Sequence, residues 1–430
     1  MHDMDKVFAQ PIHKRRKIFY LRKRFQEWKR DSLLFYPFIF MLVAVLLVLI
    51  TRQIDHYLTA SPGVPDLWLT QASSGVNTTA LVASSVLSLL AIVFSISLVA
   101  LQLSNQQFSP LVITIFERAD STKVTLSLFI ATFVYSFILL IEVQRASIEK
   151  ITVISLFTNI LLIFACLIVF IVFMKSIMLM IRVTYIITII AEKTREAIQD
   201  NLPPIEAYVE CLSAKTETPC QIIRYTRPPS RLFIKRYAQG VFRALEYSTL
   251  VEIAANHHCT LQVYLHFGDY VNQGDPIVAV YGDGELPVEP VLKAFYVEPS
   301  REIYQDPAFG IRMLVDIALQ ALSQGAHAPS IAHQVIFRLT NLLAMISQRP
   351  EHSGFFADNN HQIRVLHLVT TWEEYVELAF SEIAHYGKND PQTVHGLTDS
   401  LDYLLGIVPE ALKPALENKK MLVAEFQKRG

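Results

Sequence analysis

The chain has 430 residues, of which 52% are hydrophobic and 18% charged, and its mean hydropathy is +0.34. This composition excludes a protein that is soluble throughout and indicates an integral membrane protein. The formal net charge of −1 provides no overall field that would attract nucleic acid. The four cysteines form no closely spaced pair, so we interpret them as reduced structural thiols.

A basic segment precedes the first apolar run. Between Lys14 and Arg30 the chain carries nine basic residues, against Glu27 and Asp31. Positive residues beside a membrane span are retained on the cytoplasmic side, and the aromatic residues among them suit contact with an anionic membrane surface. Residues 1–32 are therefore predicted to form a cytoplasmic N-terminal segment.

Four apolar runs follow, and each reaches roughly the length of about 20 residues that a bilayer requires, while the second is longer than one crossing needs. The helical pattern of the last run continues to about residue 200, where a Pro-Pro pair ends it. The transmembrane domain is thus predicted at 33–200, with both termini on the cytoplasmic side, because four crossings return the chain to its starting side. The predicted spans are residues 33–50, 77–103, 124–141 and 151–174.

The composition changes again within the rest of the chain. Residues 230–300 are rich in Val, Tyr and Phe in short runs broken by Gly, Pro and Asp, which is typical of small β structures and predicts a β-rich domain at 201–300. Residues 308–349 and 371–428 show helical periodicity instead, which predicts a helical domain at 301–430. The sequence predicts a cytoplasmic α+β domain with a small β-barrel-like part followed by a helical part.

The second apolar run carries its polar residues on one line. At 100° per residue, six of them fall within about 20° of that line. A membrane helix turns such a stripe away from lipid, toward another helix, a water-filled path or a second copy of the chain. Small residues favour close helix packing, whereas long amides at both ends favour the mouths of a pore, and both interpretations stay open. This polar stripe consists of Asn77, Ser84, Ser88, Ser95, Gln102 and Gln106.

A charged cluster surrounds an Asp-Pro pair in the helical part. Arginine and aspartate around such a turn suit the binding of an anionic group. An ion-pair network that fixes the start of a helix is the favoured interpretation, with Asp306 capping the helix that begins at Pro307. The members of this cluster are Arg301, Asp306, Arg312 and Asp316.

Several functional classes lack their sequence signals. The chain contains no Gly-rich phosphate loop, nucleophile elbow, HExxH motif or paired-cysteine zinc pattern. No catalytic residue is assigned, and we expect no enzyme, no cofactor and no nucleic-acid partner. The run His257-His258-Cys259 is not expected to bind a metal, because neighbouring residues of a strand point to opposite faces.

Three motifs resemble a known bacterial family. They are V-F-S-I-S-L-V-A-L-Q-L-S-N-Q-Q-F-S-P at Val93 to Pro110, G-D-Y-V-N-Q-G-D-P-I at Gly268 to Ile277, and Q-D-P-A-F-G-I-R-M-L-V-D-I-A at Gln305 to Ala318. In this order they look like the membrane protein family catalogued as domain of unknown function 2254. The resemblance runs from the first span to about residue 410. It implies the membrane topology, in a bacterial inner (cytoplasmic) membrane, and gives no reaction.

Two details qualify this resemblance. Where the family usually has a Pro-Gly-x-Asn-Asp-Pro turn, this chain has Gln324-Gly325-Ala326-His327-Ala328-Pro329. The Gly268 to Ile277 segment is also similar to a turn of barrel-sandwich modules such as biotinyl and lipoyl carriers. Those carriers need an exposed lysine in a Met-Lys-Met-like site, which is absent here, so a structural use of the turn is favoured.

Two functions from different classes fit these observations. The first is a homo-oligomeric, channel-like membrane protein whose cytoplasmic domain assembles or gates it. The alternative is a membrane-anchored scaffold or sensor whose cytoplasmic domain binds a protein or a small ligand. The expected partners are the lipid bilayer and other copies of the chain.

Overall fold

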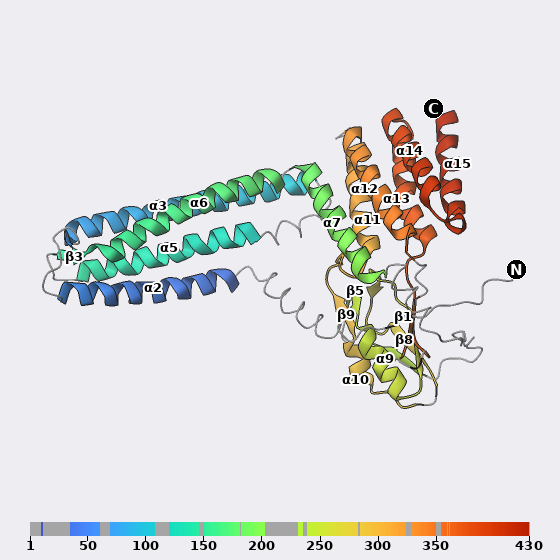
Figure 1. Ribbon diagram of the computed structural model, residues 1–430, viewed down its shortest axis with the longest axis horizontal. Coiled ribbons are helices and arrows are strands. Elements are labelled where there is room, and N and C mark those ends of the chain that lie inside the picture. Colours follow the sequence, from blue (N-terminus) through green and yellow to red (C-terminus); the bar gives the residue numbers. More distant parts are fainter. Residues whose placement is uncertain are drawn as a thin grey trace. The chain divides into compact units, whose positions relative to one another are not determined.

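The computed structural model describes residues 10–11, 35–60, 69–107, 120–145, 150–180, 182–202, 231–234, 239–282, 284–323, 328–349, 354–358, 360 and 362–429. Most of the predicted N-terminal segment lies outside this range. The chain forms two compact units, one spanning 23–185 and the other combining 1–22 with 186–430 (Figure 1). We call them the membrane unit and the second unit.

The membrane unit contains four long apolar helices that run alongside one another (Figure 1). Each includes a strongly hydrophobic segment of 21 to 26 residues, enough to cross a bilayer. The helices extend beyond the predicted spans. A short strand precedes the second of these helices and another precedes the fourth, and the two strands pair in antiparallel fashion. These elements are α2 (Phe35–Ala60), β2 (Leu69–Gln71), α3 (Ala72–Gln107), α5 (Asp120–Arg145), β3 (Lys150–Thr152) and α6 (Val153–Met180).

Helix α5 is the centre of this bundle. It packs against α2, α3 and α6, and 44% of its apolar window is buried, compared with 22% for each of the other three. Its Phe129 and Tyr135 side chains are fully buried. The interior of one copy is therefore filled by side chains of α5.

Hydrogen bonds between polar side chains also join these helices. The Tyr135 hydroxyl lies 3.2 Å from Thr51 Oγ1 on α2 and donates to the backbone carbonyl of Ser155 on α6 at 3.1 Å. The next residue of α5, Ser136, donates to Asn159 Oδ1 at 2.7 Å. Buried hydroxyl and amide groups in lipid need such partners, and these bonds fix the packing of the bundle.

The helix predicted to continue from the fourth span to about residue 200 is interrupted. Helix α6 ends at Met180, and α7 (Val183–Asn201) begins after Arg182, whose N–H donates to the Leu179 carbonyl. From Ile186 onward, α7 belongs to the second unit and buries its apolar face there. Seven of its side chains are buried: Ile186, Ile187, Ile190, Ala191, Thr194, Ala197 and Ile198.

The second unit contains two small sheets, and its described strands do not close into the expected β-barrel-like form. One sheet has the order β1-β10-β11-β6-β8-β4, the other β7-β5-β9. The strands are β1 (Gln10–Pro11), β4 (Arg231–Ile234), β5 (Gly240–Leu245), β6 (Thr260–Val263), β7 (Tyr270–Val271), β8 (Pro276–Tyr281), β9 (Phe295–Glu298), β10 (Phe355–Ala357) and β11 (Ile363–His367).

The pairing of β6 with β11 changes the predicted domain division. These strands run parallel, with Leu261 opposite Val365. The larger sheet therefore takes strands from both 201–300 and 301–430, and the two ranges share one folded unit. The Gly268 to Ile277 segment crosses from one sheet to the other, because β7 pairs with β5 and β8 pairs with β6.

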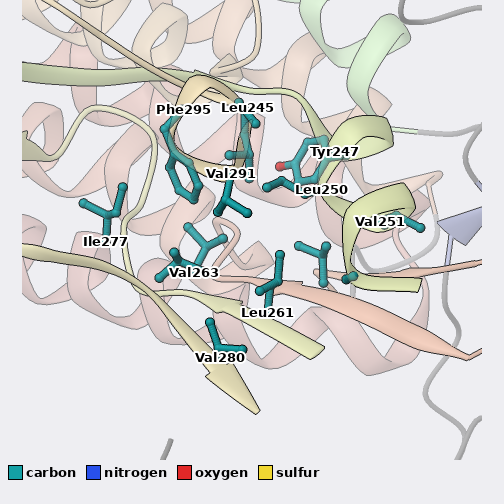
Figure 2. Packing of buried hydrophobic residues seen from close by; sticks show 14 of the residues in the cluster. Leu245, Tyr247, Leu250, Val251, Leu261, Val263, Ile277, Val280, Val291 and Phe295 are labelled. Atoms are coloured by element: carbon teal, nitrogen blue, oxygen red, sulfur yellow. The ribbon is translucent and has the colours of Figure 1, made fainter. Parts of the chain in front are cut away.

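A single apolar core lies under the sheets and two short helices, α9 (Tyr247–Asn256) and α10 (Val288–Lys293). Figure 2 shows Val263 and Ile277 from the strands together with Val291 of α10 and Phe295 of β9. All four are at most 2% exposed. Burial of each such side chain stabilises the fold by about 1.5–3 kcal/mol. This core therefore fixes the two sheets against α9 and α10.

Five helices stack beside the sheets. α11 packs on both α12 and α13, α12 packs on α14, and α15 packs on α13 and α14. α7 joins this stack at Gly310 of α11, where an added Cβ would collide with the Thr194 side chain. The helices are α11 (Pro307–Leu322), α12 (Pro329–Ser347), α13 (Trp372–Gly387), α14 (Pro391–Ile407) and α15 (Lys413–Arg429), with a short 3-10 helix at Glu410–Leu412.

Candidate functional site

The polar stripe lies on the side of α3 that faces away from the bundle. Asn77, Ser84, Ser88, Ser95 and Gln102 are all exposed. The buried positions of α3 include Val82, Val86 and Val93, which lie about 140–180° around the helix from the stripe. The side chain of Gln106 lies outside the described residues. One copy of the chain therefore leaves the described part of the stripe uncovered.

The outward faces of α2 and α6 have a different composition. Every exposed residue of α2 between 38 and 50, such as Phe38 and Leu42, is apolar. The same holds for α6 between 157 and 172, with Phe164 and Ile168 as examples. Large apolar side chains are what a lipid-facing surface presents. The exposed face of α3 carries hydroxyl and amide groups alongside large apolar side chains such as Leu81.

Two serines of the stripe satisfy their hydroxyl donors within the helix. Ser84 donates to the Leu81 carbonyl at 3.0 Å, and Ser88 donates to the Ser84 carbonyl at 2.9 Å. Such back-bonded serines are small and tolerate close contact with a neighbouring helix. The longer amides of Asn77 and Gln102 present polar groups outward at either end of the stripe.

In the second unit, the structure brings Arg301 and Asp306 together. Asp306 caps α11, since its Oδ1 accepts from the Phe309 N–H at 3.1 Å. Its Oδ2 accepts from Arg301 Nε at 2.6 Å, and the Arg301 guanidinium lies 5.0 Å from the centre of the Phe309 ring. Burial raises the pKa of Asp306, an effect that the Arg301 charge opposes.

Arg312 and Asp316 belong to a separate network on the same helix. Arg312 Nε lies 2.9 Å from Asp316 Oδ1, and the guanidinium also pairs with Glu382 of α13. This network ties α11 to α13. The predicted charged cluster is therefore two structural ion-pair groups, and an anion-binding role for it stays a prediction.

A small pocket lies where α7, the sheets and the helical stack of the second unit meet. We name it the Asp306 pocket. Asp306 and its neighbours Gln305 and Pro307 belong to a motif that the sequence analysis singled out. The other lining residues were missed, because they come from segments far apart in the chain. They are Asn201, Leu202, Tyr247, His266, Phe267, Phe356, Leu368, Val369, Thr370 and Tyr375.

The His257-His258-Cys259 run lies in the turn between α9 and β6, rather than within a strand. Cys259 is buried, and its Sγ lies 3.6 Å from the Ala254 carbonyl oxygen. Burial raises the pKa of the Cys259 thiol. Within the described part of the chain, no three His, Cys, Asp or Glu side chains gather as a metal site.

Four apolar helices with a mixed second unit define the class of this protein, a multi-pass membrane protein. A family profile described as "Predicted membrane protein (DUF2254)" matches residues 30–403. The chain therefore belongs to the domain of unknown function 2254 family of predicted membrane proteins.

The curated relatives carry no assigned activity. Uncharacterized proteins of Mycobacterium bovis and Mycobacterium tuberculosis are 24% identical to this chain over 346 residues. The match covers 78% of this chain and 64% of each relative, so the chain spans less than two thirds of their length. No solved structure matches the chain.

Proposed function

We propose that this protein is a homo-oligomeric, channel-like protein of the bacterial inner membrane, in which α3 of each copy faces a shared axis. The polar stripe carries this proposal because it lies opposite the face of α3 that packs in the bundle. In lipid, exposed hydroxyl and amide groups favour contact with another copy or with water. A second copy supplies the same stripe by symmetry.

The composition of α3 explains why the copies would leave a wet path. Ser84, Ser88 and Ser95 allow the helices to approach closely. The amides of Asn77 and Gln102 are longer and suit water at the two ends of the path. Side chains of α5 fill the interior of each copy, so the four helices of one copy leave no room for a water-filled path. A path between copies would place the hydroxyl and amide groups of the polar stripe in water.

The proposed topology has both termini in the cytoplasm. Four crossings return the chain to its starting side, and the basic segment before α2 favours the cytoplasm for that side. The second unit, which follows α6, is then cytoplasmic and suited to assemble or gate the membrane unit. We assign it no catalytic step, and lipid and other copies of the chain are the proposed partners.

Ion flux through purified protein in liposomes tests conduction. We expect flux under an applied voltage, and we expect a membrane-impermeant thiol reagent to block it when a single cysteine replaces Ser88 in a cysteine-free chain. The matched control places the cysteine at Leu161, on the outward apolar face of α6, where the reagent should leave flux unchanged. Absence of flux across a range of voltages would overturn the channel proposal.

The Asp306 pocket favours a second candidate, a membrane-anchored scaffold or sensor. In that case α3 holds the copies together without conduction, and the second unit binds a ligand. The pocket combines aromatic and polar side chains in its lining, as ligand sites commonly do. Intact oligomers that never conduct, combined with ligand binding, would favour this candidate.

A further inference from the structure

The outward face of α6 ends in a lysine. Phe164, Ile168 and Ile171 are 58%, 64% and 68% exposed, and at 100° per residue they form one apolar stripe on this helix. Lys175 follows Ile171 by one helical turn, lies on the same line and is exposed as well. The surface that α6 turns away from the bundle therefore passes from apolar side chains to a cation.

Helix geometry gives the depth of Lys175 in a bilayer. The hydrophobic segment of α6 begins at Ile154, and the roughly 21 residues from there to Lys175 rise about 31 Å. The hydrocarbon core of a bilayer is about 30 Å thick. With Ile154 at one boundary of that core, Lys175 lies at the other, and its long side chain reaches the headgroups.

A second cation follows two turns later. Arg182 is exposed and lies between α6 and α7. Its N–H donates to the Leu179 carbonyl at 3.0 Å, so the chain keeps a helix-like turn up to this residue. The roughly seven residues from Lys175 to Arg182 rise about 10 Å in such a backbone. The two long side chains together span that distance, so both can contact one phosphate group.

Neither cation has a counter-ion within the protein. Lys175 and Arg182 form no ion pair with any side chain that the structure describes. Arg52 of α2, by contrast, lies 2.9 Å from Glu142 of α5. An uncompensated charge on a lipid-facing surface is costly. A negative group of the lipid itself is the partner that removes this cost.

We propose that Lys175 and Arg182 bind the phosphate of an anionic phospholipid whose acyl chains lie along the apolar stripe of α6. Both side chains donate hydrogen bonds to phosphate oxygens. A zwitterionic lipid carries its own cation beside the phosphate, whereas an anionic lipid leaves its full negative charge to the protein. Tyr185, which is 37% exposed, follows Arg182 and adds an aromatic side chain of the kind found at headgroup level.

This lipid site goes beyond the two candidate functions and holds for either of them. Arg182 lies at the break where the chain passes from α6 to α7. A bound lipid would therefore hold this connection at the membrane surface.

Thermal unfolding of the purified full-length protein in an uncharged detergent tests this proposal. Solubilised phosphatidylglycerol is the anionic probe, phosphatidylcholine is the zwitterionic probe, and glycerol phosphate supplies the headgroup without acyl chains. We expect phosphatidylglycerol alone to raise Tm saturably, with a shift that shrinks at high salt. No saturable shift with phosphatidylglycerol, or an equal shift with phosphatidylcholine or glycerol phosphate, would overturn the proposal.

Lys175→Gln and Arg182→Gln should each weaken the apparent affinity for phosphatidylglycerol by about fivefold, and Lys175→Arg should retain it. Arg52→Gln is the matched control. It removes one positive charge at the other end of the bundle, where Asp55 of α2 accepts from the Ser155 N–H at the start of α6. This control should leave the affinity unchanged. Equal affinities of the wild type and both glutamine variants at 175 and 182 would rule out the site.

Met178 allows a test in the opposite direction. It is 59% exposed and follows Lys175 by one turn, so either charge is tolerated there. Met178→Lys should strengthen phosphatidylglycerol binding by about fivefold, and Met178→Glu should weaken it by a similar factor. The reverse order, or identical affinities in the two variants, would contradict a site for an anionic lipid.

Discussion

Gly268 and Gly274 have nearly the same backbone conformation, with φ of +95° and +97°. A side chain is strained in this left-handed region, which costs about 1–2 kcal/mol. At Gly268 an added Cβ would also collide with the Arg301 guanidinium, whereas at Gly274 nothing lies within 4 Å. The absence of a side chain at Gly268 therefore lets the backbone lie close to the guanidinium of Arg301, which pairs with Asp306.

Alanine at these two positions should separate strain from collision. We expect Gly274→Ala to lower the free energy of unfolding by about 1–2 kcal/mol, and Gly268→Ala by a further 1–3 kcal/mol or so, because the ion pair must move. Denaturant titration of the full-length protein measures both. Equal costs would show that Arg301 adapts freely to the new methyl group.

Asp358 provides a pH-dependent contribution to stability. Its carboxylate is buried and accepts from Arg364 Nε at 2.8 Å. Although burial acts to raise the pKa of Asp358, hydrogen bonds from Arg364 and from the backbone of Gln362 and Asn360 hold it below the ordinary value. A depressed folded-state pKa stabilises the fold above the unfolded pKa of about 3.9 and loses that effect as pH falls further.

Asp358→Asn should therefore destabilise the protein by about 1.5–3 kcal/mol at pH 7. The difference from wild type should shrink below about pH 4, where the wild-type carboxylate also loses its charge. Asp402→Asn, in an exposed ion pair with Lys420, is the control and should cost less than about 1 kcal/mol. A pH-independent difference for Asp358 would contradict this account.

The contact between α7 and α11 depends on one small residue. Gly310 leaves no room for a side chain because Thr194 of α7 lies against it. Gly310→Ala should cost about 1–3 kcal/mol, and Thr194→Ala in the same chain should recover part of that loss by removing two of the colliding atoms. Denaturant titration of the single and double variants measures the coupling. Additive losses would mean that the two residues do not meet.

The apolar runs identified the four long helices and the Asp-Pro pair identified the Asp306 cap, because each rests on a local pattern of neighbouring residues. The same patterns could not show the break at Arg182 or the pairing of Leu261 with Val365. Both features depend on which distant segments pack together, and the residue pattern of a single sequence does not contain that information. The lining of the Asp306 pocket was missed for the same reason.

The boundary of the second unit has a measurable consequence. The sequence predicts that the domain after the membrane helices begins at residue 201, yet α7 contributes buried residues from Ile186 onward to this unit. A fragment of residues 186–430 should unfold cooperatively on heating. A fragment beginning at 204 should aggregate or lose its transition, because it exposes the surface that α7 covers. Equal stability of the two fragments would contradict this boundary.

Disulfide cross-linking along α3 in native membranes tests most directly whether copies meet at the polar stripe. Single cysteines at Ser84, Ser88 and Ser95 in a cysteine-free chain should form cross-linked dimers under mild oxidation. Cysteines at Leu87 and Phe94, which are exposed on α3 but lie about 80–100° from the stripe, should not. Dimers that form at Leu87 and Phe94 but not at the serines, or at no position of α3, would contradict the proposed assembly.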